Sequence, residues 1–271
     1  MLKAVTYVIL EKNVPLERME KTVANKNIFD KDFILLDGAM GTMLQQKGMD
    51  LGTVPETLNI TKPDWIIDIH KQYIDAGSDV VYANTFGANR YKMANTGYSV
   101  DELIGAAINN AKEAAKGTET LVALDMGPIG QLLEPTGSLS FEEAYDIFKE
   151  EVIAGRNAGA DIIVIETMTD LMETKAAILA AKENSDLQVM CTMTFEDNKR
   201  TFTGCSVSAM CLTVQGLGVD ALGVNCSLGP KELIPIVDEI SKWTTVPIEV
   251  KANAGLPDPG TKTDSVLPDE F

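Results

Sequence analysis

From residue 33 onward, short apolar segments alternate with longer amphipathic segments of helical period. This alternation is typical of strand–helix–strand units that build a parallel sheet. Several of the apolar segments contain no polar position, as expected of strands that are covered on both faces. The strands predicted in this way are 33–36, 80–83, 121–124, 162–165, 188–194, 221–224 and 247–250.

The amphipathic segments carry recognisable start and stop signals. Ser140, with Glu143 three residues later, has the pattern of a capping box. Gly77 and Gly159 stand where helices are expected to stop. The helices predicted most clearly are 63–76, 141–158 and 171–183. His70, the single histidine, lies in the first of them and is expected to be a packing or surface residue.

The order and spacing of these segments favour an α/β fold, a TIM (β/α)8-type barrel, over an open sheet. The strand count is one short of eight. Residues 4–10 (AVTYVIL) either fill the eighth position or leave the barrel open, and an irregular extension against the barrel bottom is an equal alternative. A helix is predicted at 16–23. We therefore divide the chain into an N-terminal extension, 1–32, and one barrel domain, 33–271, incomplete at its C-terminus.

Composition and charge narrow the class of protein. With 271 residues, 45% of them hydrophobic, the chain can bury a core of one domain. A net charge of −17 argues against nucleic acid and anionic membrane surfaces as partners, because both require clustered Lys and Arg. No apolar segment is long enough for a membrane span. Four cysteines in a long chain indicate reduced thiols and a cytoplasmic location.

In a barrel of this kind, the functional residues follow the C-terminal ends of the strands. Here those positions combine glycines with single carboxylates and amides. Free backbone N–H groups among isolated polar side chains suit a small zwitterion such as an amino acid. The segments concerned are 37–42, 84–89, 125–130, 166–170, 225–230 and 251–257.

Short motifs in these segments carry a family resemblance. DGAMGT, NTFGAN, Gly127-Pro128, Glu166-Thr167, Thr203-Gly204, GVNCSLGP and NAGLP occur in this order. Each motif alone is weak, but the ordered set over roughly residues 33–271 resembles the homocysteine S-methyltransferases. The similarity is greatest to the branch that contains the homocysteine-binding domain of cobalamin-dependent methionine synthase. The resemblance implies methyl transfer to homocysteine, which forms methionine.

The resemblance also implies a zinc site. In the family, zinc is held by the cysteine of the GxNC motif and by two adjacent cysteines of a GGCC motif after strand eight, and the homocysteine sulfur takes the fourth position. Cys226 matches the first ligand. Zinc coordination would deprotonate the homocysteine thiol and keep it nucleophilic.

Further site residues carry over by position. Asp37 and Glu166 match acidic positions associated with the amino group of homocysteine, and both are our candidates for catalytic residues. Backbone N–H groups near the substrate carboxylate are expected from Gly38, Ala39, Met40 and Gly41. Asn225 and Asn253 are further candidates for substrate binding.

The sequence departs from the family at its end. Residues 267–271 resemble the start of the family's seventh helix, and no GGCC motif occurs, so one of three expected zinc ligands is present. We expect that this chain does not hold zinc tightly. Cys205 is a weaker candidate for a replacement ligand, whereas Cys191 and Cys211 are expected to be small buried hydrophobes. Tyr82 and Ala252 stand where relatives often carry other residues, which affects the expected shape of the pocket.

Two functional hypotheses remain open. The first is a homocysteine methyltransferase whose donor is corrinoid-linked or folate-linked. Because no DxHxxG motif occurs, methylcobalamin would come from a corrinoid protein or cobalamin domain. The alternative is a truncated, zinc-deficient and inactive module for amino-acid binding or assembly, and a shortened fragment of a larger enzyme is a third explanation. The oligomeric state is not predicted.

Overall fold

Strands and helices alternate along the chain as the hydrophobic pattern predicts. The computed structural model describes residues 6–9 and 28–254. The strands are β1 (Thr6–Ile9), β2 (Phe33–Leu36), β3 (Val80–Tyr82), β4 (Leu121–Met126), β5 (Ile162–Met168), β6 (Gln188–Met193), β7 (Ala221–Asn225) and β8 (Ile248–Lys251). They form a closed barrel in this order, and β2 to β8 run parallel to one another.

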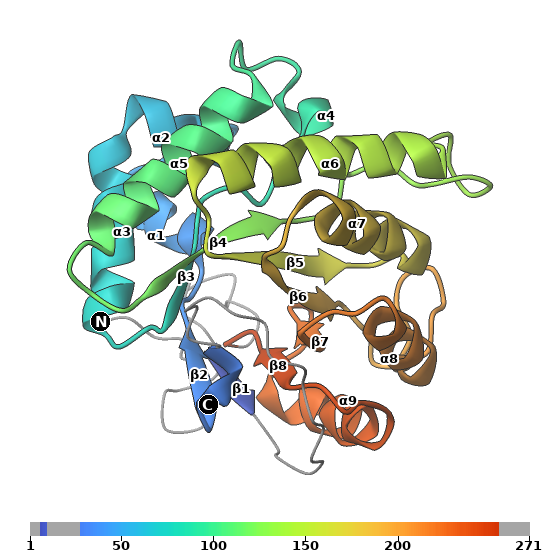
Figure 1. Cartoon of the computed structure of the whole chain (residues 1–271). Helices are drawn as coiled ribbons and strands as arrows, with labels where there is room; N and C mark the ends of the chain where they lie inside the picture. Colours follow the sequence, from blue (N-terminus) through green and yellow to red (C-terminus); the bar gives the residue numbers. More distant parts are fainter. Residues whose placement is uncertain (1–5, 10–27, 255–271) are drawn as a thin grey trace.

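Helices connect the parallel strands and lie outside the barrel (Figure 1). The α-helices are α1 (Met40–Gln46), α2 (Leu58–Thr61), α3 (Pro63–Asp75), α4 (Arg90–Met93), α5 (Val100–Ala114), α6 (Phe141–Ala158), α7 (Leu171–Asn184), α8 (Val207–Gly216) and α9 (Pro230–Trp243). Two short 3-10 helices, η1 (Ile28–Asp30) and η2 (Pro55–Thr57), complete the described elements. The α/β barrel class expected from the sequence is confirmed.

The position next to β2 and β8 is filled by the N-terminal strand. β1 pairs antiparallel with both neighbours, and Tyr7 lies opposite Leu35 on one side and Val250 on the other. Of the alternatives that the sequence leaves open, the structure therefore has the one in which 4–10 supplies the missing strand. The predicted helix 16–23 lies outside the described residues, and the domain boundary at residue 32 stays a prediction.

The core has two parts, because alternate side chains of each strand point to opposite faces of the barrel wall. The inner part collects residues that point into the barrel, including Ile34, Leu36, Val80, Val164 and Met190. The remaining strand positions pack outward against the helices in a larger cluster. This division follows from the period of two in a strand, which sends successive side chains to opposite faces. Residues at the ends of the inward series therefore reach the barrel mouth.

The helix boundaries carry the expected caps, although at Ser140 only one of the two hydrogen bonds of the predicted capping box is formed. The Ser140 hydroxyl accepts a hydrogen bond from the Glu143 N–H at 3.1 Å, and Gly77 and Gly159 adopt left-handed φ values of 104° and 91° after α3 and α6. His70 is fully buried on α3, and burial lowers its pKa to about 4, so it is neutral at physiological pH. Within the described residues, no helix is both long and apolar enough to cross a membrane.

A close approach between β7 and β8 requires a glycine. Gly223 pairs with Glu249 across the two strands, and a Cβ atom at Gly223 would lie 1.7 Å from the Glu249 carbonyl oxygen. The obstructing atom belongs to the backbone of a barrel strand, so it cannot rotate away. The glycine of the GVNC segment therefore has a structural role in bringing Glu249 and Lys251 beside Asn225.

We predict that Gly223→Ala destabilises the barrel by about 3 kcal/mol, the upper end of the usual cost of overpacking, because one strand must move to accommodate the methyl group. Chemical denaturation measures the loss. Gly105→Ala is the matched control: a Cβ atom added to Gly105 in α5 would have no other atom within 4 Å, and alanine in a helix is favoured over glycine by roughly 0.5–1 kcal/mol. Equal stability of the two variants would contradict the proposed steric role.

Candidate functional site

Polar side chains replace apolar ones at the last inward positions of the barrel strands. In β4, the inward-pointing residue after Ala123 is Asp125. In β5, the inward-pointing residue after Val164 is Glu166. The last inward-pointing residue is Asn225 in β7 and Lys251 in β8. Because the C-terminal ends of parallel strands meet at one end of a barrel, these groups gather at its mouth.

Glu166 and Lys251 form the central ion pair of this cluster. The Lys251 Nζ atom donates to Glu166 Oε2 at 3.0 Å, and the side chains of Lys251 and Glu166 are only 16% and 12% exposed. Lys251 Nζ also lies 3.8 Å from the centre of the Tyr82 ring, within cation–π distance. Burial by itself would lower the pKa of Lys251, but Glu166, Asp37, Glu249 and Asp125 outweigh it and raise that pKa. The lysine is therefore firmly cationic.

Asp37 lies beside this pair at the end of β2. Its Oδ2 atom accepts a hydrogen bond from the Tyr82 N–H at 2.8 Å, whereas the buried Oδ1 atom has no partner among the described residues. Burial raises the pKa of Asp37 to about 7, against the lowering effect of Lys251. Glu166 raises the same pKa further, so the two carboxyl groups interact electrostatically. A cation placed between them would relieve that repulsion.

Two more buried carboxyl groups surround Lys251. Glu249 Oε1 accepts a hydrogen bond from the Tyr82 hydroxyl at 2.8 Å, and burial raises the pKa of Glu249 to about 7. Burial followed by the charge of Glu166 raises the pKa of Asp125 well above its usual range. Asp125 Oδ1 and Glu249 Oε2 are both buried without a hydrogen-bond partner in the described part of the chain. The mouth thus contains more carboxyl groups than Lys251 can neutralise.

The thiol of Cys226 belongs to the same cluster. Burial, and then the charge of Glu166, raise the pKa of Cys226. Its Sγ atom lies 3.8 Å from Thr167 Oγ1 and accepts a hydrogen bond from Asn225 Nδ2 at 3.4 Å. Asp37, Glu166 and Cys226, three residues widely separated in sequence, thus all lie at the C-terminal ends of strands, and the charge of Glu166 acts on the other two. Their joint contact with a substrate stays a prediction.

Asn225 connects the walls of the site. Its Oδ1 atom accepts hydrogen bonds from the Thr167 N–H and the Thr192 hydroxyl, both at 2.9 Å, and its Nδ2 atom donates to Thr167 Oγ1 at 2.7 Å. Both ends of the amide are thus occupied by protein groups. Its predicted contact with substrate stays a prediction, and in this structure the side chain positions β5 and Cys226.

The backbone is strained at the residues that hold the thiol. Thr167, Cys226 and Ser227 have left-handed φ values of 61°, 58° and 52°, which cost of order 1–3 kcal/mol each in non-glycine residues. Hydrogen bonds hold this geometry: the Cys226 N–H donates to the Lys251 carbonyl at 3.0 Å, and the Ser227 hydroxyl to the Phe195 carbonyl at 2.7 Å. Such strain is typical of functional sites.

The other predicted binding residues lie at neighbouring strand ends. Gly38 is packed against Tyr73, whose hydroxyl donates to the Ala39 carbonyl at 3.3 Å, and Met40 and Gly41 begin α1. Asn253 follows β8, and its N–H donates to the Leu228 carbonyl at 3.0 Å. The structure thus brings these positions to the C-terminal side of the barrel, and their contact with a substrate carboxylate or amide stays a prediction.

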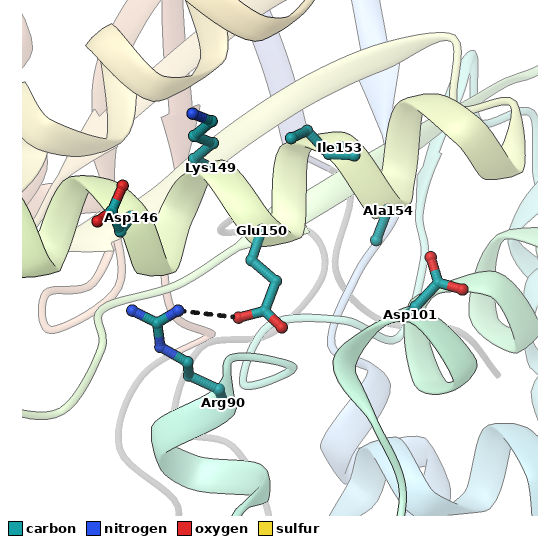
Figure 2. Close-up of a pocket in the computed structure, with 7 residues that line it drawn as sticks. All are labelled: Arg90, Asp101, Asp146, Lys149, Glu150, Ile153 and Ala154. Atoms are coloured by element: carbon teal, nitrogen blue, oxygen red, sulfur yellow. Dashed lines mark hydrogen bonds and ion pairs between the residues drawn. The ribbon is translucent and has the colours of Figure 1, made fainter.

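Two surface hollows lie apart from this cluster. One, of about 430 Å³, is lined by helices α4 to α6, where Arg90 and Glu150 form an ion pair at 3.4 Å (Figure 2). The other, of about 510 Å³, is lined by the loops after β4, β5 and β6 and contains Arg200 and Cys205. Neither is lined by Asp37, Glu166 or Cys226. Mixed surface charges in the first hollow give it no chemistry comparable to that of the mouth.

The positions of the four cysteines show which of them could act as zinc ligands. Cys191 and Cys211 are buried in the apolar core, as expected, and Cys205 donates its S–H to the Ser206 carbonyl in the second hollow. Over residues 28–254, no group of three or more His, Cys, Asp or Glu side chains is placed to hold a metal ion. A zinc site needs at least three protein ligands. Cys226 with these neighbours therefore does not fit zinc by itself.

Some residues of the cluster were not predicted as site residues from sequence. Thr167 belongs to the Glu166-Thr167 motif but was not proposed as a site residue. Lys251, Glu249 and Asp125 lie in or beside the strand-end segments that the sequence analysis singles out, and no motif marks them. A detectable signal exists for Glu249 and Lys251: they place charges at alternate positions of an otherwise apolar strand. Charges with that spacing point into the barrel, where they require partners.

Comparison with known proteins gives consistent results. Residues 34–270 match the sequence profile of the family described as homocysteine S-methyltransferase. The chain is 32% identical to methionine synthase of Mycobacterium tuberculosis (strain ATCC 25618 / H37Rv) over 281 aligned residues, which cover 92% of this chain and 23% of that protein. For methionine synthase of Mycobacterium leprae (strain TN), the identity is also 32%, with coverages of 90% and 22%. The chain thus spans less than a quarter of these relatives.

A solved structure agrees with the sequence comparison. The metallated form of the homocysteine methyltransferase MmuM from Escherichia coli superposes with a TM-score of 0.77 at 25% identity, covering 85% of this chain and 87% of that one. The fold, the ordered motifs and the profile match over most of the chain indicate the same family. The chain belongs to the homocysteine S-methyltransferase family.

Proposed function

We propose that this chain binds L-homocysteine at the barrel mouth and presents its sulfur to a methyl donor. In the reaction, the thiol proton is released to solvent and the sulfur attacks the methyl carbon. The bond from that carbon to the donor breaks, and its electron pair stays on the donor. The observation that carries the proposal is the arrangement around Lys251. Its Nζ atom pairs with Glu166, and its carbonyl accepts a hydrogen bond from the Cys226 N–H. The Tyr82 ring beneath the Nζ atom belongs to the residue whose N–H donates to Asp37.

The carboxyl groups of the mouth suit the α-ammonium group of an amino acid. Asp37 has an unpartnered oxygen, and Glu166 is held at the same place by Lys251. An ammonium group that contacts both would gain charge-assisted hydrogen bonds in a poorly solvated site. We assign Asp37 and Glu166 this role, and the backbone of 38–41 a role in binding the carboxylate. Cys226 then marks the direction in which the homocysteine sulfur points.

The family relationship implies zinc chemistry at the sulfur. We propose Cys226 as the zinc ligand that this part of the chain contributes. Because the described donors do not complete a site, the metal enters no step of the reaction written above. What the residues themselves supply is a buried, weakly acidic thiol beside the pocket for the ammonium group.

The relatives and the cysteines support a proposal for the methyl donor and the cellular compartment. Both curated relatives are methionine synthases, of which this chain covers less than a quarter. We propose that the methyl group comes from methylcobalamin carried by a separate corrinoid protein or cobalamin domain. The four cysteines are unpaired thiols, which agrees with a reducing compartment, and we propose the cytoplasm.

A second candidate function is an amino-acid-binding module without methyl transfer. It is favoured by one observation, the lack of a group of metal ligands within residues 28–254. The two functions share the binding step and differ in turnover. Incubation with homocysteine and methylcobalamin separates them, because only the first produces methionine.

We predict that homocysteine affinity rises with pH. The pKa of Asp37 is about 7 in the free protein; below it the carboxyl group is neutral and attracts an ammonium group weakly, and above it the group is anionic. Affinity should therefore increase between about pH 6 and pH 8. Asp37→Asn should lower the affinity at pH 8 by about 10-fold to 100-fold, the usual strength of a charged hydrogen bond, and reduce this pH dependence, of which the carboxyl group of Glu249 retains a part.

Isothermal titration calorimetry with L-homocysteine under reducing conditions measures both effects. Asp68→Asn is the control, because Asp68 is paired with Lys47 on the outer surface of the barrel. An Asp37→Asn variant that binds with unchanged affinity and the same pH profile would disprove the role of Asp37.

Zinc affinity gives a further test. We predict that this chain binds Zn²⁺ weakly in competition with a chelating dye, and that Cys226→Ser removes the residual binding, because one thiolate cannot form a closed site. Cys205→Ser serves as the control. Stoichiometric, tight binding that persists in the Cys226 variant would refute the assignment of Cys226.

A further inference from the structure

Lys251 forms an ion pair with Glu166, the carboxylate to which the substrate ammonium group is proposed to bind. Its Nζ atom lies 3.0 Å from Glu166 Oε2, and the charges of Asp37, Asp125 and Glu249 also act on it. The lysine enters from the end of β8, where the Tyr82 ring supports its charge from one side at 3.8 Å. In the free protein, a cation of the protein itself thus takes the place of an ammonium ligand at Glu166.

The arrangement limits which cations can bind beside Lys251. A second positive charge at Glu166 would come close to Lys251 Nζ, because both cations would contact the same carboxylate. Repulsion between like charges is strong in a poorly solvated site. A simple amine would have to overcome it. A ligand that brings its own negative charge next to its ammonium group would not.

An α-amino acid carries this pair of charges on one carbon atom. When its ammonium group contacts Glu166, its carboxylate lies close to that residue. Lys251, which pairs with Glu166 in the free protein, can then contact the substrate carboxylate. The lysine side chain is flexible and carries three donors. Exchange of partners would leave every charge paired: the substrate ammonium with Glu166 and Asp37, and Lys251 with the substrate carboxylate.

We propose that Lys251 determines specificity for zwitterionic α-amino acids, by releasing Glu166 to the substrate ammonium group and binding the substrate carboxylate. This inference rests on the proposed function, since it takes the amino acid to bind at Glu166. A carboxylate accepts several hydrogen bonds, so Lys251 adds to the backbone N–H groups of 38–41 and does not replace them.

The test compares two ligands that differ in one group. L-Homocysteine carries the carboxylate, and 3-aminopropane-1-thiol is the same molecule without it. Calorimetric titration of the full chain and of Lys251→Met gives four affinities. We expect Lys251→Met to weaken homocysteine binding by about 10-fold to 100-fold. Binding of the amine should be unchanged or tighter in the variant, because a competing cation has been removed.

Two further variants control for folding and charge. Lys251→Arg keeps a cation at the position and should retain a preference for homocysteine over the amine. Lys242→Met removes an exposed lysine from α9 and should change neither affinity. Thermal unfolding of each variant shows whether the barrel is intact. If the Lys251→Met variant does not fold, the same titrations are made with Lys251→Gln, whose side chain is polar and uncharged.

The outcomes separate the two proposals. If the wild-type chain binds neither ligand, the proposed function fails and the inference fails with it. If the wild-type chain binds homocysteine and Lys251→Met binds it equally well, only the role of Lys251 is overturned. Equal loss of both ligands in a folded variant also overturns it, because Lys251 would then act only by shaping the site.

Discussion

The structure depends on one electrostatic constraint: the mouth of the barrel buries several carboxyl groups around a single lysine. Isolated buried carboxylates are costly, and in practice such groups remain protonated or find a cation. Glu166 finds Lys251, whereas Asp37 and Glu249 have pKa values raised to about 7. The site is therefore poised between protonation and the binding of a second cation. This property suits a protein that binds the ammonium group of an amino acid.

The scaffold explains how that cluster is assembled. Inward positions of β4, β5, β7 and β8 end in polar residues, and Gly223 allows β8 to approach β7 closely enough to place Lys251 beside Asn225. Residues 167, 226 and 227 have left-handed backbone conformations, and the thiol of Cys226 contacts Thr167 and Asn225. The wall is completed by an N-terminal strand that runs against the direction of its two neighbours.

Much of the fold could be predicted from the sequence, because strand and helix periods are local properties. All seven apolar segments correspond to strands, and the capping at Ser140 and Gly159 follows local chemistry. The strand within 4–10 could be predicted, but not its antiparallel pairing, because pairing depends on contacts distant in sequence. Asp37, Glu166 and Cys226 could be proposed through motifs. Lys251 and Glu249 belong to no motif. Their alternating charges in an apolar strand are a sequence signal, but their roles depend on neighbours in other strands, which the sequence does not show.

The central claim is that the sulfur of a bound amino acid points toward Cys226 while its ammonium group lies between Asp37 and Glu166. A crystal structure of this chain with L-homocysteine bound tests it most directly. The account predicts the ligand in the barrel mouth in that orientation. A ligand bound in the hollow beside Cys205, or one in the mouth with its sulfur directed away from Cys226, would contradict it.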